Sequence, residues 1–110
     1  MAKGTYIHKG DIIDYVNGGA SAIEYNEVIP LVTRIGIAAE KISVGATGAV
    51  RAVGVFELPS VNNAAFSVGD QLYWDAAAGN LTKTSSGNTP AGWATESKLT
   101  AGTTARIKIG

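Results

Sequence analysis

Glycine and proline divide this chain into short segments, and that division constrains the fold more than any other feature. Fourteen glycines and three prolines are spread over 110 residues, and no stretch long enough for three helical turns lacks both. Isolated helices shorter than this are marginal in water, and a long helix is not expected. Between these residues lie short segments rich in Val, Ile, Thr and aromatic side chains, which favour strands. The sequence therefore predicts short strands joined by tight turns.

We predict about seven to eight strands from the alternation of apolar and polar residues and from the turn residues between them. The longest segment, 49–58, is apolar almost throughout, which is typical of a strand buried on both faces. Residues 60–67 fit either one short helical turn or a loop. The predicted strands cover residues 11–16, 31–37, 49–58, 71–75, 81–84, 91–96 and 104–109.

This pattern indicates an all-β fold without helical crossovers. Two architectures satisfy it, a small Gly-rich β-barrel or a two-sheet sandwich, since either buries one face of every strand. Residues 1–9 are expected to form an extended N-terminal arm, and residues 10–110 a single β domain. No strong internal repeat is expected. Residues 9–15 and 68–75 are similar, and we interpret them as two comparable entries from a turn into a strand.

Charge and composition argue against several classes of partner. Nine Lys and Arg residues balance nine Asp and Glu residues, so no basic field attracts a nucleic acid. The chain has no cysteine, which excludes disulfides and thiolate metal sites. No apolar run is long enough for a membrane span, and residues 1–8 have no apolar core like that of a signal peptide. We therefore expect neither a nucleic acid nor a membrane as partner.

No constellation of side chains predicts catalysis, a metal or a cofactor. His8 is the one histidine and lies in the arm, outside the packed cleft that a catalytic triad or a zinc site requires. The carboxylates show no pairing that selects a general acid and base, and Asp11, Asp70 and Asp75 stand at positions typical of turns. Neither a P-loop nor a Gly-x-Gly pattern occurs. We therefore predict a protein that is not an enzyme and holds no metal or cofactor.

The adjacent aromatic residues Tyr73 and Trp74 must point to opposite faces of the strand predicted over 71–75. One is therefore expected in the core and the other on the outer surface. An outward aromatic side chain could anchor a protein interface or stack on a sugar. Core packing, protein contact and sugar contact all stay open at this point.

Three segments, in the same order, resemble the phage capsid cement (head decoration) protein family, which has sometimes been mislabelled as recombinase-like. The segments are 10–15, 54–59 and 69–75, and the tail from Gly87 onward also fits, so the resemblance covers essentially the whole chain. One departure is Ser60, where many relatives have a lysine. The motif residues are Gly10, Asp11, Phe56, Glu57, Leu58, Pro59, Gly69, Asp70, Trp74, Asp75 and Gly92.

The resemblance implies a structural protein that binds the exterior of a tailed-phage or prophage capsid and joins capsid subunits from outside. Its partners would be the major capsid protein and further copies of itself, with a trimer favoured over a dimer. It would be made in the bacterial cytoplasm and end on the virion. The alternatives are a carbohydrate- or cell-surface-binding β module and another head–tail structural component. The expected capsid or oligomer contacts are Tyr6, Ile7, His8, Tyr73 and Trp74.

Overall fold

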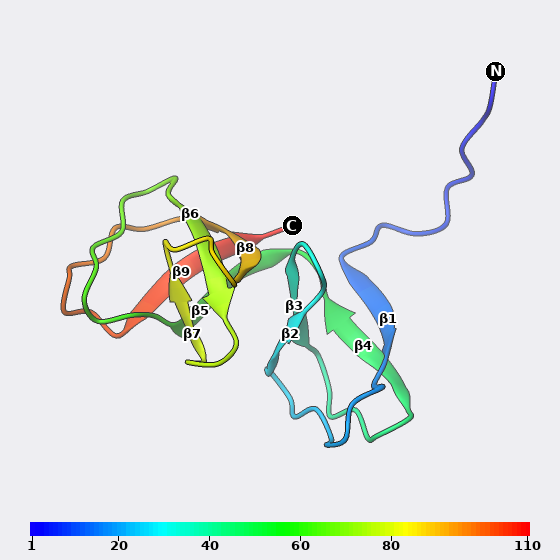
Figure 1. The fold of residues 1–110 in the computed structure, drawn as a ribbon. Helices are drawn as coiled ribbons and strands as arrows, with labels where there is room; N and C mark the ends of the chain where they lie inside the picture. Colours follow the sequence, from blue (N-terminus) through cyan, green and yellow to red (C-terminus); the bar gives the residue numbers. More distant parts are fainter.

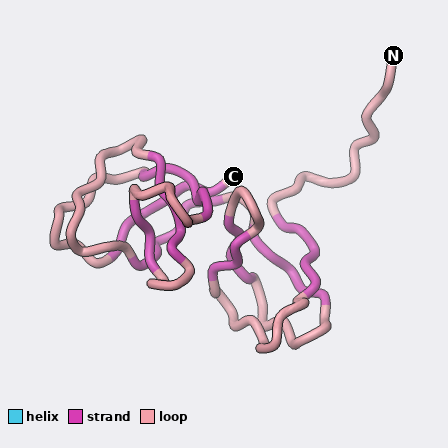
Figure 2. The backbone as a smooth tube through the Cα atoms, viewed as in Figure 1, coloured by secondary structure: helices cyan, strands magenta, loops and turns pink.

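The computed structural model describes residues 1–110 and contains strands, turns and loops but no helix (Figure 1). Figure 2 shows that long loops separate the strands at the outer ends of the molecule. The all-β prediction is confirmed, with nine strands, more than the sequence indicated. The strands are β1 Ile12–Val16, β2 Val28–Pro30, β3 Ile35–Ala38, β4 Thr47–Arg51, β5 Gly54–Pro59, β6 Gln71–Asp75, β7 Asn80–Thr82, β8 Thr89–Ala94 and β9 Thr104–Ile109.

The strands form two antiparallel sheets. One has four strands in the order β1-β4-β3-β2, and the other has five in the order β5-β9-β8-β6-β7. We call residues 10–52 the first lobe and residues 53–110 the second lobe. Figure 1 shows the lobes side by side, with the C-terminus between them. The two-sheet sandwich is therefore confirmed, and the barrel, the other architecture considered, is not formed.

The lobes have the same connectivity once β7 is set aside. β1, β2, β3 and β4 correspond, in order and in pairing, to β5, β6, β8 and β9. In each lobe, one isolated bridge joins the segment before the second strand to the segment before the fourth. The bridge pairs Ile23 with Ile42 in the first lobe and Phe66 with Lys98 in the second. The expectation of no strong repeat is therefore wrong at the level of structure.

The register repeats as well as the connectivity. Ile29 lies opposite Gly36 in the first lobe, as Leu72 lies opposite Gly92 in the second. The similarity between residues 9–15 and 68–75 does not reveal this repeat, because it compares β1 with β6, whereas β6 corresponds to β2. Asn26 corresponds to Gly69, and both have a positive φ. The other corresponding pairs are Glu27 with Asp70, Ala38 with Ala94, Ile42 with Lys98, and Ala49 with Arg106.

The strand predicted over residues 31–37 is wrong in its first half. Residues 31–34 form the turn that joins β2 to β3, and Val32 in this turn has a φ of 60°. Pro30 ends a strand rather than beginning one. It is tolerated there because β2 is an edge strand, where a missing N–H leaves no ladder partner unsatisfied.

The apolar segment 49–58 is two strands rather than one. β4 ends in the first sheet, Ala52 and Val53 carry the chain across, and β5 begins in the second sheet. Both strands alternate in burial, so the apolar composition reflects two half-buried strands and not one strand buried on both faces. Residues 60–67 form an irregular segment with two isolated bridges and no helical turn.

Each lobe has its own core, and the second core is the larger. Five buried residues form the first core, and twelve form the second. Ile35 and Ile37 of β3 belong to the second core, so β3 packs the first lobe against the second. The first core consists of Ile23, Ile29, Ala38, Ile42 and Val50.

Candidate interaction surface

Residues 1–9 form an arm that leaves the first lobe at β1 and extends away from it (Figure 1). Tyr6 is 83% exposed and Ile7 is 78% exposed, so the arm carries apolar side chains that its own chain does not cover. His8 is exposed beside them. Three of the five residues predicted to make contacts therefore lie together on an extended, exposed segment.

Two local contacts hold the base of the arm. The Gly10 N–H donates to His8 Nδ1 at 3.0 Å, and Lys9 Nζ lies 3.7 Å from Asp11 Oδ2. The charged side chains of residues 1–9 are those of Lys3 and Lys9, and the segment has no acidic residue. The arm is therefore a basic segment with an apolar centre.

Tyr73 and Trp74 point to opposite sides of β6, as predicted. Trp74 is 8% exposed and packs in the second core, because the alternation of β6 places it on the same side as Leu72. Trp74 is thus a core residue, which corrects its placement at a contact surface, while Tyr73 is half-buried. The more exposed aromatic group of this sheet is Trp93 on β8, which is 42% exposed.

The motif glycines stand where other residues would be strained. Gly10 and Gly69 have φ values of 82° and 91° in the turns before β1 and β6. Gly92 has a φ of 154°, and a Cβ atom there would clash with the Lys108 carbonyl oxygen on β9. Gly92 therefore allows two central strands of the second lobe to approach each other.

The motif aspartates have different roles. Asp70 Oδ2 accepts from the Ser67 N–H at 2.8 Å, and Asp75 Oδ1 accepts from two backbone N–H groups of the turn after β6, both at 3.1 Å. These two residues close turns, as expected. Asp11 makes the ion pair with Lys9 instead.

The motif residues 56–59 lie on β5, which is an edge of the second sheet. Leu58 is buried, Phe56 is half-buried, and the exposed Glu57 lies 4.0 Å from Arg106. Pro59 ends the strand. These residues share their place on an edge strand and differ in burial. We therefore interpret this motif as a determinant of the fold rather than as a binding site.

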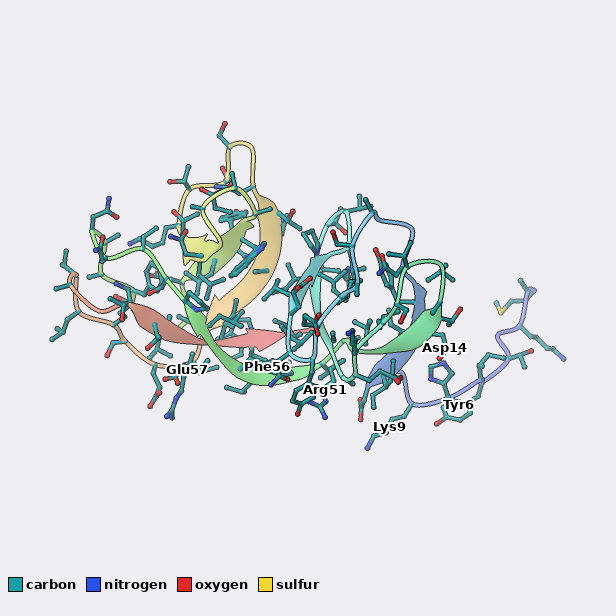
Figure 3. The ribbon with its side chains drawn as sticks, turned by 90° about the horizontal axis from the view of Figure 1, so that it is seen from below. Tyr6, Lys9, Asp14, Arg51, Phe56 and Glu57 are labelled. Atoms are coloured by element: carbon teal, nitrogen blue, oxygen red, sulfur yellow. The ribbon has the colours of Figure 1, made fainter.

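Exposed apolar side chains lie on the corresponding edge strands β1 and β5. Figure 3 shows Glu57, Phe56, Arg51, Lys9 and Tyr6 along one side of the molecule, from the second lobe to the arm. Unpaired strand edges and exposed apolar groups together favour contact with another protein. The exposed apolar residues on or beside these two strands are Ile12, Val16, Val53 and Val55.

A groove of about 400 Å³ opens in the first lobe between the end of β1 and β2. Tyr15 and Asn17 line one side, and Glu27, Ile29 and Pro30 line the other. Because β2 is an edge strand, one side of its backbone has no strand partner. Sequence reasoning missed this groove, because it predicted no strand over β2.

Lys98 is a buried cation that the sequence did not distinguish from a surface lysine. It is 8% exposed, and its Nζ lies 4.9 Å from the centroid of the Phe66 ring. Desolvation by burial lowers the pKa of Lys98. Lys98 is not among the residues that line the groove, and its hydrogen bonds connect the loop before β9 to the segment after β5. Its Nζ donates to the carbonyl oxygens of Val61, Leu99, Thr100 and Gly102, at 2.9–3.4 Å.

The structure contains no helix long and apolar enough to cross a membrane. It also brings together no group of three or more His, Cys, Asp or Glu side chains that could hold a metal ion. The exposed arm, the open strand edges and the groove define a small all-β protein whose surface is suited to contact with other proteins.

Residues 7–109 match the phage cement protein family, and the chain belongs to this family. The resemblance inferred from the sequence motifs is thereby confirmed. No curated protein and no solved structure gives a significant match. Family membership gives the protein a structural role in the phage capsid.

Proposed function

We propose that this protein decorates the exterior of a tailed-phage capsid and stabilises the shell by joining neighbouring capsid subunits. The observation that carries the proposal is the match of residues 7–109 to the phage cement protein family. The exposed arm and the apolar edges of β1 and β5 support it, because each offers backbone or apolar surface to a protein partner.

Shell stabilisation follows from differential affinity. A protein that binds the joined arrangement of capsid subunits more tightly than the separated one shifts the equilibrium toward the joined state. Tyr6, Ile7 and His8 of the arm are proposed contact residues, toward the capsid or toward a further copy of the chain, and Tyr73 is a further candidate on the second lobe. In this role the protein acts without catalysis, metal or cofactor.

Closed symmetric oligomers are common among proteins that associate with themselves. We propose that the decorating unit is such an oligomer, with a trimer favoured over a dimer. The chain is proposed to be made in the bacterial cytoplasm and to join the capsid exterior there.

Co-sedimentation with shells of the phage's major capsid protein, before and after expansion, tests the proposal. Saturable binding to expanded shells, with a raised shell melting temperature, is the expected result. Absence of binding to either form would contradict it. Glycan binding that is lost on Trp93→Ala would support the carbohydrate-binding alternative instead.

Removal of residues 1–9 tests the contribution of the arm. We expect loss of decoration with an unchanged unfolding transition, because the arm adds no residue to either core. Decoration at the wild-type level by the shortened chain would exclude the arm as a contact.

A further inference from the structure

The second lobe contains a strand that has no counterpart in the first. β7 pairs with the outer edge of β6, and its Leu81 is fully buried. Leu81 also bridges Ser60, and its carbonyl oxygen accepts from the Val61 N–H at 3.0 Å. β7 thus fills the space between the end of β5 and β6.

The corresponding space in the first lobe is the groove. β2 corresponds to β6, and Asn17 corresponds to Ser60, because the N–H groups of both residues donate to the loop before the fourth strand of their lobe. No strand covers β2, and Tyr15 and Ile29 line the open space. The first lobe therefore lacks a strand that its own connectivity has room for.

The charges at this place are also unmatched. Asp70 precedes β6, and its Oδ2 lies 3.7 Å from Nζ of Lys83, which follows β7. Glu27 holds the corresponding position before β2, is exposed, and forms no ion pair. The missing strand should therefore carry an apolar side chain followed two residues later by a cation.

The arm has this pattern. Residues 80–83 read Asn-Leu-Thr-Lys, and residues 6–9 read Tyr-Ile-His-Lys, so Ile7 corresponds to Leu81 and Lys9 to Lys83. In an extended chain, residues two apart point to the same side. Ile7 is largely exposed in its own copy, and the basic arm complements Glu27, the one charged residue that lines the groove.

We propose that the groove of one copy binds residues 6–9 of a second copy as an added strand antiparallel to β2. Ile7 fills the groove, and Lys9 exchanges its contact with its own Asp11 for the neighbour's Glu27. The arm points away from its own body, which leaves it available to another copy (Figure 1). Exchange of arms links copies in a reciprocal pair or a closed ring. This inference goes beyond the capsid role, because it needs no shell.

Disulfide cross-linking tests the proposal on a clean background, since the chain has no cysteine. Ile7→Cys chains are mixed with Ala22→Cys chains, because Ala22 lines the groove. Ile7→Cys chains mixed with Leu99→Cys chains are the control, since Leu99 is 84% exposed on the second lobe. We expect the mixed disulfide in the first mixture well above the control. Equal yields, or a chain with both Ile7→Cys and Ala22→Cys that closes its disulfide internally, would overturn the proposal.

Charge exchange gives a second, independent readout by sedimentation equilibrium of the purified protein. Glu27→Lys and Lys9→Glu should each weaken self-association, by roughly tenfold, and the chain carrying both substitutions should recover it. Glu24→Lys, an exposed acid outside the groove, is the matched control and should change nothing. A monomeric wild type, or failure of the double variant to recover, would contradict the proposal. Neither result would bear on shell binding, which co-sedimentation measures separately.

Discussion

The two lobes share one connectivity but differ in how completely they are closed. The second lobe has five strands and a core of twelve buried residues, of which Ile35 and Ile37 come from β3, whereas the first has four strands and a core of five. In the second lobe β7 covers the outer edge of β6, and in the first the corresponding edge of β2 is open. The comparison shows that one backbone path can leave the edge of its second strand covered or open, depending on a single further strand.

The lobes also fasten their loops differently. In the first, Asn17 Nδ2 donates to the carbonyl oxygens of Ser21 and Ile42, both at 2.9 Å. In the second, Lys98 holds the position of Ile42 and binds four carbonyl oxygens itself. A neutral amide thus does in one lobe what a buried ammonium group does in the other.

The largest expected difference between the lobes is at the two corresponding glycines. Gly92→Ala should destabilise the protein by about 4 kcal/mol, because its Cβ meets the Lys108 carbonyl oxygen in a positive-φ conformation. Gly36→Ala should cost about 2 kcal/mol, because the clash is with the side chain of Val50, which can shift in part. Urea unfolding measures both. Equal losses would show that the two glycine positions are equally constrained.

Lys98→Met should cost about 3 kcal/mol, because it retains the packing of the side chain but leaves four partly buried carbonyl oxygens without this donor. Asn17→Ala should cost about 1.5 kcal/mol, since it leaves only two such oxygens. The same unfolding measurement applies. A larger loss for Asn17→Ala would mean that the hydrogen bonds of the neutral Asn17 amide contribute more to stability than those of the Lys98 ammonium group.

Hydrogen exchange measures the difference between the lobes at their corresponding strands β2 and β6. The Ile29 amide should exchange about tenfold faster than the Leu72 amide, because β2 lies at an open edge of a small core and β6 lies between two strands. Mass spectrometry of the two peptides gives the ratio. Similar protection of both amides would indicate that the first lobe is as closed as the second.

The smallest effect is expected on the surface of the second lobe. Arg106 lies 3.2 Å from Glu96 and 4.0 Å from Glu57, and all three side chains are more than half exposed. Arg106→Ala should therefore change the free energy of unfolding by no more than about 0.5 kcal/mol. A loss above about 1 kcal/mol would show that this pair contributes more than exposed ion pairs usually do.

Where turn residues bound a regular alternation, the sequence predicted strands correctly. The predicted segments 71–75 and 104–109 coincide with β6 and β9. The split of 49–58 was not predictable, because Ala52 and Val53 carry no turn signal and only the pairing of each half determines its sheet. The repeat was hidden because corresponding residues differ chemically, as Ile42 and Lys98 do.

The candidate site was predictable only in its local part. The arm followed from its position before the first turn. Tyr6 and Ile7 are exposed on it, and their role as contacts stays a prediction. The groove depends on segments distant in sequence that only the fold brings together, Tyr15 from one edge and Ile29 from the other. Trp74 was misplaced because alternation shows that neighbouring residues face opposite sides but not which side is the core.

Electron cryo-microscopy of expanded shells decorated with this protein tests most directly whether each copy joins neighbouring capsid subunits. The predicted map places each copy across a boundary between neighbouring capsid subunits, with strand density in the groove beside β2. Density confined to the surface of a single capsid subunit, with an empty groove and no contact across a boundary, would contradict both the bridging role and the exchange of arms.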